Sequence, residues 1–384
     1  MNTSSIMQRN IGFLTFFLSG ICAISSGVVV SLLQEYYGFE YGMTGTLLSF
    51  MSIGNLMAGF AAGILPSRLG LKKTVVLLTL GYAAGYLLMG ISGWMILLML
   101  AFFLVGIAKG CTLNICTVLI KNNTSNSTKG MNTMHSCYAL GALLCPFAIA
   151  AAAAASPLLP MFVLTFAGLL LWGAFAAVPM DNQGTQKGTA TDWSFLKSSK
   201  FWILTGLLFC QNAAETSVTG WMVTYFKGSG ILTGLFSTYT VTVMWGATLI
   251  ARLLIAFVFP VKNAASSMIK MGIGCIIFYA GLMMVNSQIA AVLLLFAFAF
   301  SMAGMNPTAV ASAGRMTSVT SMGVMLPVAS SGAILMPWLI GIIAQYSSIH
   351  MGMFSNIVPC LGMLLFSIAL KRLERQNASA VHSS

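Results

Sequence analysis

Twelve apolar segments, each long enough to cross a lipid bilayer, constrain this chain more than any other feature. A helix rises about 1.5 Å per residue, so about 20 apolar residues span the hydrocarbon core of roughly 30 Å. The segments divide evenly between the two halves of the 384-residue chain. They cover residues 11–33, 43–66, 73–91, 94–119, 131–153, 158–178, 200–226, 234–260, 266–286, 288–311, 322–347 and 351–370. The sequence therefore predicts an all-α membrane protein with twelve transmembrane helices.

Composition supports the same class and argues against several others. Hydrophobic residues make up 58% of the chain and charged residues 6%, whereas a soluble domain carries about a quarter of charged residues. Glycine, lysine and threonine nowhere take the spacing of a phosphate-binding loop, which argues against an ATP-driven pump. The eight cysteines form no Cys-x-x-Cys pair, and of the three histidines only His135 lies in a predicted span, so no metal cluster can be assembled. We expect no metal, no cofactor, no catalytic residue and no enzymatic activity.

The two halves carry copies of one short motif. Gly141-Ala-Leu-Leu-Cys-Pro146 recurs 191 positions later as Gly332-Ala-Ile-Leu-Met-Pro337, and each copy lies in the fifth span of its own half. Duplicated halves are typical of solute transporters, whose binding site lies between the halves. We predict two pseudo-symmetric six-helix bundles, at residues 1–180 and 200–384, joined by a cytoplasmic linker at 181–199. A short cytoplasmic tail ends the second bundle.

Basic residues gather on one side of the predicted membrane. When the connections are assigned to alternate faces, one face receives Lys227 alone. The other receives fifteen basic residues: Arg9, Arg68, Lys72, Lys73, Lys121, Lys129, Lys187, Lys197, Lys200, Lys262, Lys270, Arg315, Lys371, Arg372 and Arg375. The positive-inside rule makes this face cytoplasmic, so we predict a multi-pass protein of the cytoplasmic membrane with both termini inside. The net charge of +12 thus reflects topology and contact with membrane lipid, and we expect no nucleic-acid partner.

A glycine-rich basic stretch connects the second and third spans. It reads Gly63-Ile-Leu-Pro-Ser67-Arg68-Leu-Gly-Leu-Lys72-Lys73. This resembles the signature loop of the major facilitator superfamily, Gly-x-Leu-x-Asp-Arg-x-Gly-x-Lys-Lys, with Ser67 where that family usually has aspartate. The resemblance implies that Arg68 and Lys72 act at the cytoplasmic gate, while Ser67 weakens the charge-relay role of the loop. The alternative is a loop that is merely positive.

Two further stretches resemble the fucose–galactose–hexose branch of this superfamily. They are Asn132-x-x-His135 in the fifth span and Glu215-x-x-x-x-Gly-Trp221-x-x-x-Tyr225 in the seventh. The resemblance implies two six-helix bundles that rock around a central cavity lined by helices one, four, seven and ten. It also implies a small-molecule solute as partner, and since one chain forms the whole pathway we expect a monomer.

Three ionisable residues lie inside the hydrocarbon zone, where charges are costly and therefore functional by default. They are Lys109 in span four, Glu215 in span seven and Arg252 in span eight. The helical rise places Lys109 about 15 Å and Glu215 about 22 Å from the cytoplasmic ends of their spans, close to mid-membrane. Arg252 is nearer that side, which favours a role in capping helix ends at the cytoplasmic gate over contact with substrate.

Polar residues accompany these charges on the same helix faces. Gln211 lies one turn from Glu215, and Thr112 lies on the face of Lys109; Asn306 precedes a proline in span ten that interrupts the helical hydrogen bonds. This interruption would provide either a bend for gating or a polar contact for substrate. Trp221 offers a face for a sugar ring. The predicted substrate-binding set is Lys109, Thr112, Gln211, Asn212, Glu215, Trp221 and Asn306.

These residues indicate a secondary active transporter. We expect Glu215 to take up a proton and the proton gradient to drive import of a sugar, a sugar acid or a small organic anion. Lys109 favours an anion, and the first span carries no acid in its membrane part. A permanent ion pair between Lys109 and Glu215 that only fixes the fold is the alternative for these two residues. An exporter of drugs or metabolites working as a proton antiporter is the alternative function, since 27 methionines would make adaptable walls.

Overall fold

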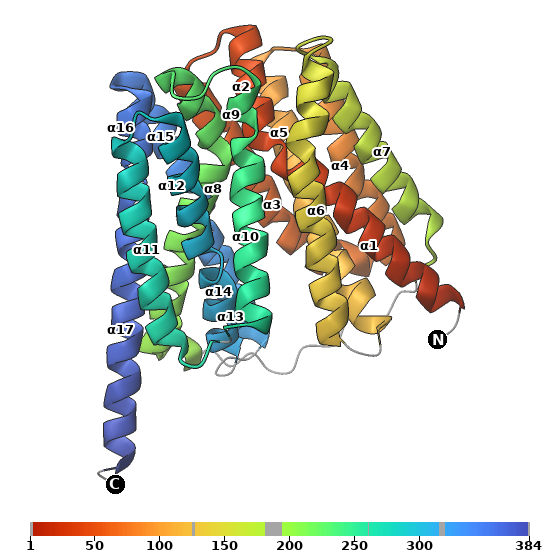
Figure 1. Ribbon diagram of the computed structural model, residues 1–384. Coiled ribbons are helices and arrows are strands. Elements are labelled where there is room, and N and C mark those ends of the chain that lie inside the picture. The colour runs from red at the N-terminus through yellow and green to blue at the C-terminus, as the bar shows by residue number, and fades with distance from the viewer. Residues whose placement is uncertain (1–2, 125–126, 181–193, 260, 315–318, 383–384) are drawn as a thin grey trace. The chain divides into compact units, whose positions relative to one another are not determined.

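The computed structural model describes residues 3–124, 127–180, 194–259, 261–314 and 319–382 (Figure 1). These residues form helices and contain no strand. Lys187 and Arg315, which belong to the basic set that predicts topology, lie outside the described residues, as does most of the predicted linker.

Seven helices build the first half of the chain: α1 (Thr3–Ile24), α2 (Ser26–Tyr37), α3 (Tyr41–Leu69), α4 (Leu71–Ile91), α5 (Met95–Asn122), α6 (Ser127–Ala153) and α7 (Leu159–Ala177). A short 3-10 helix, η1 (Ser194–Lys197), precedes the second half. That half contains α8 (Ser199–Ser229), α9 (Leu235–Thr238), α10 (Thr240–Phe257), α11 (Ala264–Met284), α12 (Gln288–Met302), α13 (Met305–Gly314), α14 (Val319–Ser330), α15 (Gly332–Tyr346), α16 (Ile349–Phe354) and α17 (Ile357–His382).

Interruptions account for the larger number of helices. Five predicted spans consist of two consecutive helices each: α1–α2, α9–α10, α12–α13, α14–α15 and α16–α17. Counted as spans, the described helices make twelve crossings, which confirms the predicted fold class. Ten are long and apolar enough to cross a membrane. The other two, α3 with 29 residues and α8 with 31, have the required length, since about 20 residues suffice.

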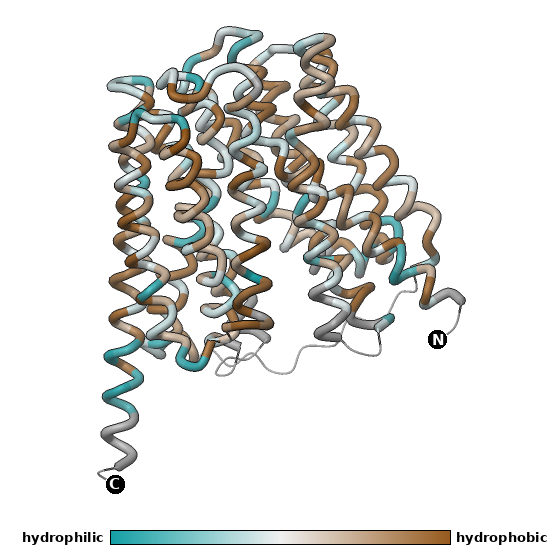
Figure 2. The backbone as a smooth tube through the Cα atoms, viewed as in Figure 1, coloured by the Kyte–Doolittle hydropathy of each residue, from teal (hydrophilic) through white to brown (hydrophobic). Residues whose placement is uncertain are grey.

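Helix ends depart from the prediction mainly at the two termini of the chain. The first helix begins at Thr3 and the last continues to His382, beyond the predicted limits of 11 and 370. Hydropathy changes where polar residues begin, whereas helical hydrogen bonds continue through residues of good helix propensity. Hydrophilic residues accordingly mark the C-terminal part of α17 (Figure 2).

The chain forms two compact units. Unit 1 comprises Met1–Gln186, Thr219–Lys227 and Thr233–Thr242; unit 2 comprises Lys187–Val218, Gly228–Leu232 and Val243–Ser384. Helix α8 thus belongs to unit 2 up to Val218, to unit 1 from Thr219 to Lys227, and to unit 2 again at its last two residues. The domain boundaries expected from the sequence stay a prediction.

The last third of α8 packs against the first half of the chain within unit 1. A Cβ added to Gly27 of α2 would lie nearer to the Thr219 carbonyl oxygen than van der Waals contact allows. The rings of Tyr41 and Trp221 pack with centroids 6.2 Å apart. These contacts make the end of α8 an integral part of unit 1.

The repeated motif has the same packing role in both units. Gly141 of α6 sits directly on the carbonyl oxygen of Phe17 in α1, and Gly332 of α15 sits on that of Phe209 in α8. An added Cβ would clash with the backbone in each case. The first glycine of each copy therefore lets the fifth spanning helix approach the first spanning helix of its own half.

Candidate functional site

Three polar side chains form a hydrogen-bonded chain in unit 2. Gln211 of α8 is 1% exposed, and its Nε2 donates to the carboxylate of Glu215 one turn later. Its Oε1 accepts from Nδ2 of Asn306 in α13, at 2.8 Å. Glu215 and Asn306 are only partly buried. The structure thus brings together three of the predicted substrate-binding residues, although their roles stay predictions.

The interruption between α12 and α13 positions Asn306. Pro307 has no N–H group, so it cannot bond the carbonyl of Ala303, four residues earlier. The helix breaks at this carbonyl: α12 ends at Met302 and α13 begins at Met305. Asn306 consequently lies in the first turn of the new helix. The sequence correctly predicted that this proline would interrupt the helical hydrogen bonds.

Arg252 of α10 takes the place of the missing donor. Its Nε donates to the carbonyl oxygen of Ala303 at 3.4 Å. An uncompensated backbone carbonyl inside a membrane span is costly, so the guanidinium stabilises the break. Capping of a helix end by Arg252 was expected from the sequence; its part in a cytoplasmic gate stays a prediction.

The remaining predicted site residues are distributed over unit 1, with one exception. Lys109 is partly buried and Thr112 fully buried on α5, while Trp221 is fully buried beside Tyr41. Asn212, on α8 in unit 2, is partly exposed. Because Lys109 and Glu215 belong to different units, their pairing stays a prediction.

The loop between α3 and α4 carries the two residues predicted for a cytoplasmic gate. Gly70 has φ +83°, a conformation that glycine adopts without strain, and it separates the two helices. Arg68 before it is exposed, and Lys72 after it is partly buried. Their function in gating is untested by this geometry.

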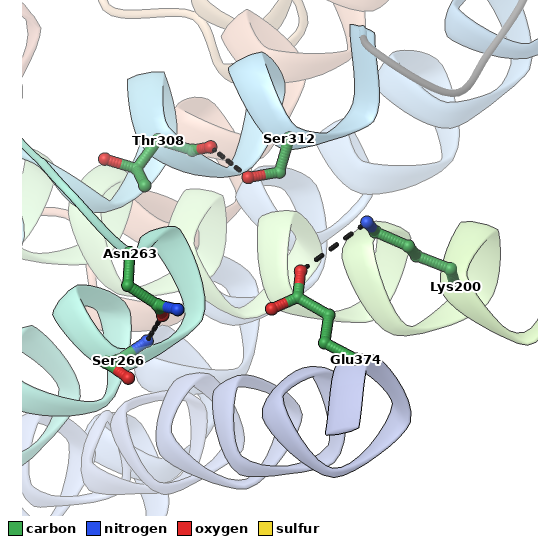
Figure 3. Close-up of polar contacts among 6 residues, drawn as sticks. All are labelled: Lys200, Asn263, Ser266, Thr308, Ser312 and Glu374. Carbon is green, nitrogen blue, oxygen red and sulfur yellow. Dashed lines mark hydrogen bonds and ion pairs between the residues drawn. The ribbon is translucent and has the colours of Figure 1, made fainter. Parts of the chain in front are cut away.

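Each unit holds an ion pair at an end of α8, and Glu215 belongs to neither of these pairs. In unit 2, Lys200 at the start of α8 lies 3.5 Å from Glu374 of α17 (Figure 3). In unit 1, Lys227 at the end of α8 lies 2.7 Å from Glu35 of α2. The first of these fixes the extended part of α17 to α8.

Short polar contacts stabilise two unit-2 helices near their ends. Asn263 caps α11 by accepting from the backbone N–H of Ser266 at 2.8 Å, and Ser312 of α13 donates to the Thr308 carbonyl at 2.9 Å (Figure 3). Neither contact includes a carboxylate.

A second polar cluster, in unit 1, was missed from the sequence. Ser19 of α1 shares a hydrogen bond of 2.8 Å with the hydroxyl of Tyr82 in α4. Tyr86, one turn further along α4, donates to the Cys22 carbonyl and lies 2.6 Å from the Ser25 hydroxyl. Both tyrosines are buried. Two tyrosines spaced four residues apart in an otherwise apolar span share a helix face, and this spacing was the available signal.

Comparison with known proteins identifies the family. The model of the Major Facilitator Superfamily matches residues 12–329, which is most of the chain. The protein belongs to the Major Facilitator Superfamily.

Individual relatives are distant. A protein TsgA homolog of Yersinia pestis (strain Pestoides F) is 25% identical over 228 residues, covering 57% of this chain and 56% of the relative. The protein thus matches little more than half the length of these curated relatives. A TsgA homolog of Yersinia pseudotuberculosis (serotype O:1b, strain IP 31758) matches to the same extent.

Solved structures share the fold over nearly the whole chain. A mutant of the nucleoside transporter NupG has a TM-score of 0.78 at 12% identity, covering 96% of this chain and 99% of that one. A bacterial homolog of the human lysosomal transporter Spinster, in an inward-facing and occupied conformation, has a TM-score of 0.70 at 10% identity, covering 96% of both chains. Family and fold together define a multi-span membrane transport protein and not an enzyme.

Proposed function

We propose that this protein is a secondary active transporter that imports a small polar solute together with protons by alternating access. The solute class is a sugar, a sugar acid or a small organic anion. The observation that carries the proposal is the chain from Asn306 through Gln211 to Glu215, a partly exposed polar site inside spanning helices.

The carboxylate of Glu215 is the proposed proton acceptor. A carboxylate inside a span is costly, and its hydrogen bond within the described residues comes from the single amide of Gln211. It forms no ion pair there. A proton would remove the charge, so uptake and release of a proton at Glu215 supplies a physical route to coupling.

Lys109 is the proposed contact for a negatively charged group of the solute. It is the one basic residue in the spanning part of α5, and an ammonium binds a carboxylate as a point charge. Membrane lipid surrounds the single chain, which we propose to work as a monomer in the cytoplasmic membrane. Both termini lie on the cytoplasmic side in this proposal, in keeping with the basic residues on that face.

Export by proton antiport is the second candidate. The 27 methionines favour it, because flexible thioether side chains adapt to varied apolar solutes. Import and export differ in the direction of solute movement under an imposed pH gradient, so one transport assay separates them.

The first experiment identifies the solute. Purified protein is screened by thermal shift at two pH values against sugars, sugar acids, amino acids, nucleosides and small carboxylates, since a bound ligand stabilises the folded state. We expect a hit among sugars, sugar acids or organic anions whose stabilisation disappears in Lys109→Ala. Stabilisation by apolar drugs alone would instead support the exporter.

The second experiment tests proton coupling in proteoliposomes with the identified solute. Glu215→Gln should abolish accumulation driven by a pH gradient while solute exchange at equal concentrations continues, because exchange does not require the release of a proton. Glu35→Gln is the matched control, since it neutralises a carboxylate at the end of α2 and should leave accumulation intact. Unchanged pH-driven accumulation in Glu215→Gln would exclude Glu215 as the coupling residue.

A further inference from the structure

The chain from Asn306 to Glu215 has a single direction of hydrogen-bond donation. An ionised carboxylate only accepts hydrogen bonds, so Gln211 must turn its NH2 group toward Glu215. Its carbonyl oxygen then faces Asn306, which must donate in turn. Asn306 therefore selects the orientation of the Gln211 amide that stabilises the charged form of Glu215.

We infer that Asn306 is a positioning residue for Glu215, acting through Gln211, and that this chain links the protonation of Glu215 to the interruption between α12 and α13. The inference deepens the proposed function at the same site, and it requires only that Glu215 binds a proton. Asn306 does not touch Glu215 in this scheme; it acts by fixing the amide between them.

Protonation would remove the requirement that Gln211 donate to Glu215, because a carboxylic acid keeps an acceptor oxygen and gains an O–H donor. The new O–H group of a neutral Glu215 can donate to the side-chain oxygen of Gln211, one turn earlier on the same helix face. Turning the Gln211 amide would present its NH2 group to Asn306, which would have to turn as well or lose the contact. Asn306 follows directly after the break at Ala303, so this change reaches the helix where its backbone hydrogen bonds are already incomplete.

Few other charged groups face this part of α8 within the described residues of unit 2. Helix α10 contributes Arg252, which donates to Ala303. Helices α13 and α15 contain no charged residue, and the charges of α17 lie at its far end, from Lys371 onward. The thiol groups of Cys210 on α8 and Cys360 on α17 are buried. Lys109, the solute contact of the proposed function, belongs to unit 1.

The test measures the protonation of Glu215 directly and needs no solute. Infrared difference spectra of the purified protein are recorded across a pH range, and the carboxyl band that is absent in Glu215→Gln is assigned to Glu215. Asn306→Leu removes the donor to Gln211, so the charged form loses stabilisation. The pH midpoint of the band should therefore rise by about one pH unit.

The matched control is Asn114→Leu, which makes the same change in α5, the fourth span of the first half. Asn114 is exposed, and its substitution should leave the midpoint unchanged. Should Asn306→Leu fail to fold, Asn306→Asp keeps the shape and removes the same donor. It should shift the pH midpoint of the Glu215 band in the same direction. The infrared signal of the introduced carboxyl group is removed by subtracting the spectrum of the Asn306→Asp/Glu215→Gln double variant.

A double variant decides whether Asn306 acts through Gln211. Gln211→Leu alone should raise the midpoint at least as far as Asn306→Leu, and the two changes together should give no more than Gln211→Leu alone. Additive shifts, or no shift in Asn306→Leu, would overturn the inference.

The outcomes also separate this inference from the proposed function. A raised midpoint in Asn306→Leu together with unchanged pH-driven uptake in Glu215→Gln would retain the positioning role and reject proton coupling. An unchanged midpoint in Asn306→Leu together with lost pH-driven uptake in Glu215→Gln would retain proton coupling and reject the positioning role.

Discussion

The first spanning helix of unit 1 and its counterpart in unit 2 differ in the polar groups that they hold. Both cross the fifth helix of their half at a motif glycine, which sits on Phe17 in one unit and on Phe209 in the other. Two positions further on, α1 has Ser19, bonded to a buried tyrosine, whereas α8 has Gln211, bonded to a carboxylate. Equivalent packing thus supports a buried cluster without a carboxylate in one unit and a cluster with a partly buried carboxylate in the other.

A second contrast concerns the fourth span of each half. Helix α5 runs unbroken from Met95 to Asn122 and contains no proline, while its counterpart is divided into α12 and α13 before Pro307. The break supplies Asn306 to the charged cluster of unit 2. The comparison teaches that the duplicated scaffold can stay the same while its two copies of the fourth span hold different polar groups, Lys109 in the unbroken α5 and Asn306 after the break before α13.

The largest expected effect tests the shared packing. Gly141→Ala and Gly332→Ala each place a methyl group against a backbone carbonyl of the facing helix, so both should destabilise the fold by about 1–3 kcal/mol or more. Thermal unfolding in detergent measures this. Gly173→Ala is the control, because open space surrounds that position. If one of these substitutions lowered the unfolding temperature strongly and the other did not, the two motif glycines would not have equivalent packing roles.

The next effect tests the broken helix of unit 2. Arg252→Leu leaves the Ala303 carbonyl without its donor, which should cost about 1–3 kcal/mol. Pro307→Ala restores an N–H group that can bond this carbonyl, so the cost of Arg252→Leu should fall in that background. Thermal unfolding of the four variants forms a double-mutant cycle. Equal costs in both backgrounds would show that the guanidinium serves another purpose.

A smaller effect tests the neutral cluster of unit 1. Tyr86→Phe removes the donor to the Cys22 carbonyl and should lower stability by about 1 kcal/mol. The pH dependence of transport should stay that of the wild type, since the cluster contains no carboxylate. A pH profile that moves in Tyr86→Phe would contradict the division of roles between the two units.

The smallest effect concerns the ion pair between Lys227 and Glu35. The side chains are 24% and 69% exposed, and such pairs contribute about 0.2–1 kcal/mol. Glu35→Gln should therefore lower the unfolding temperature slightly, and added salt should reduce the difference. A loss comparable to that of the motif glycines would mean that charge, and not close packing, holds the end of α8 in unit 1.

The fold was predictable because it depends on local length and polarity. Apolar runs of about 20 residues separated by basic loops specify spans without knowledge of their neighbours, and the twelve observed crossings follow them. The break before Pro307 was predictable for the same reason, since a missing N–H group acts on its own helix. The break at Ser25 was not predicted. The Cys22 carbonyl there accepts from the Ser25 hydroxyl at 2.8 Å and from Tyr86, and the second of these donors comes from another helix.

The candidate site was predictable in part. Gln211 and Glu215 are one turn apart, and helix geometry alone puts them together. The bond from Asn306 is a tertiary contact between distant segments, so the sequence could suggest its residues but not their direction of donation. The capping of Ala303 by Arg252 likewise required knowledge of which helices are neighbours.

The division of α8 between the two units has a consequence for expressing the two halves of the chain as separate fragments. A gene severed inside the linker at 181–199 would yield a first fragment without Thr219–Lys227, which belong to its own unit. Gly27 and Tyr41 would then lose the surface that they cover. The second fragment would have to supply this piece before unit 1 became complete, so the first half of the chain depends on the second half for its assembly.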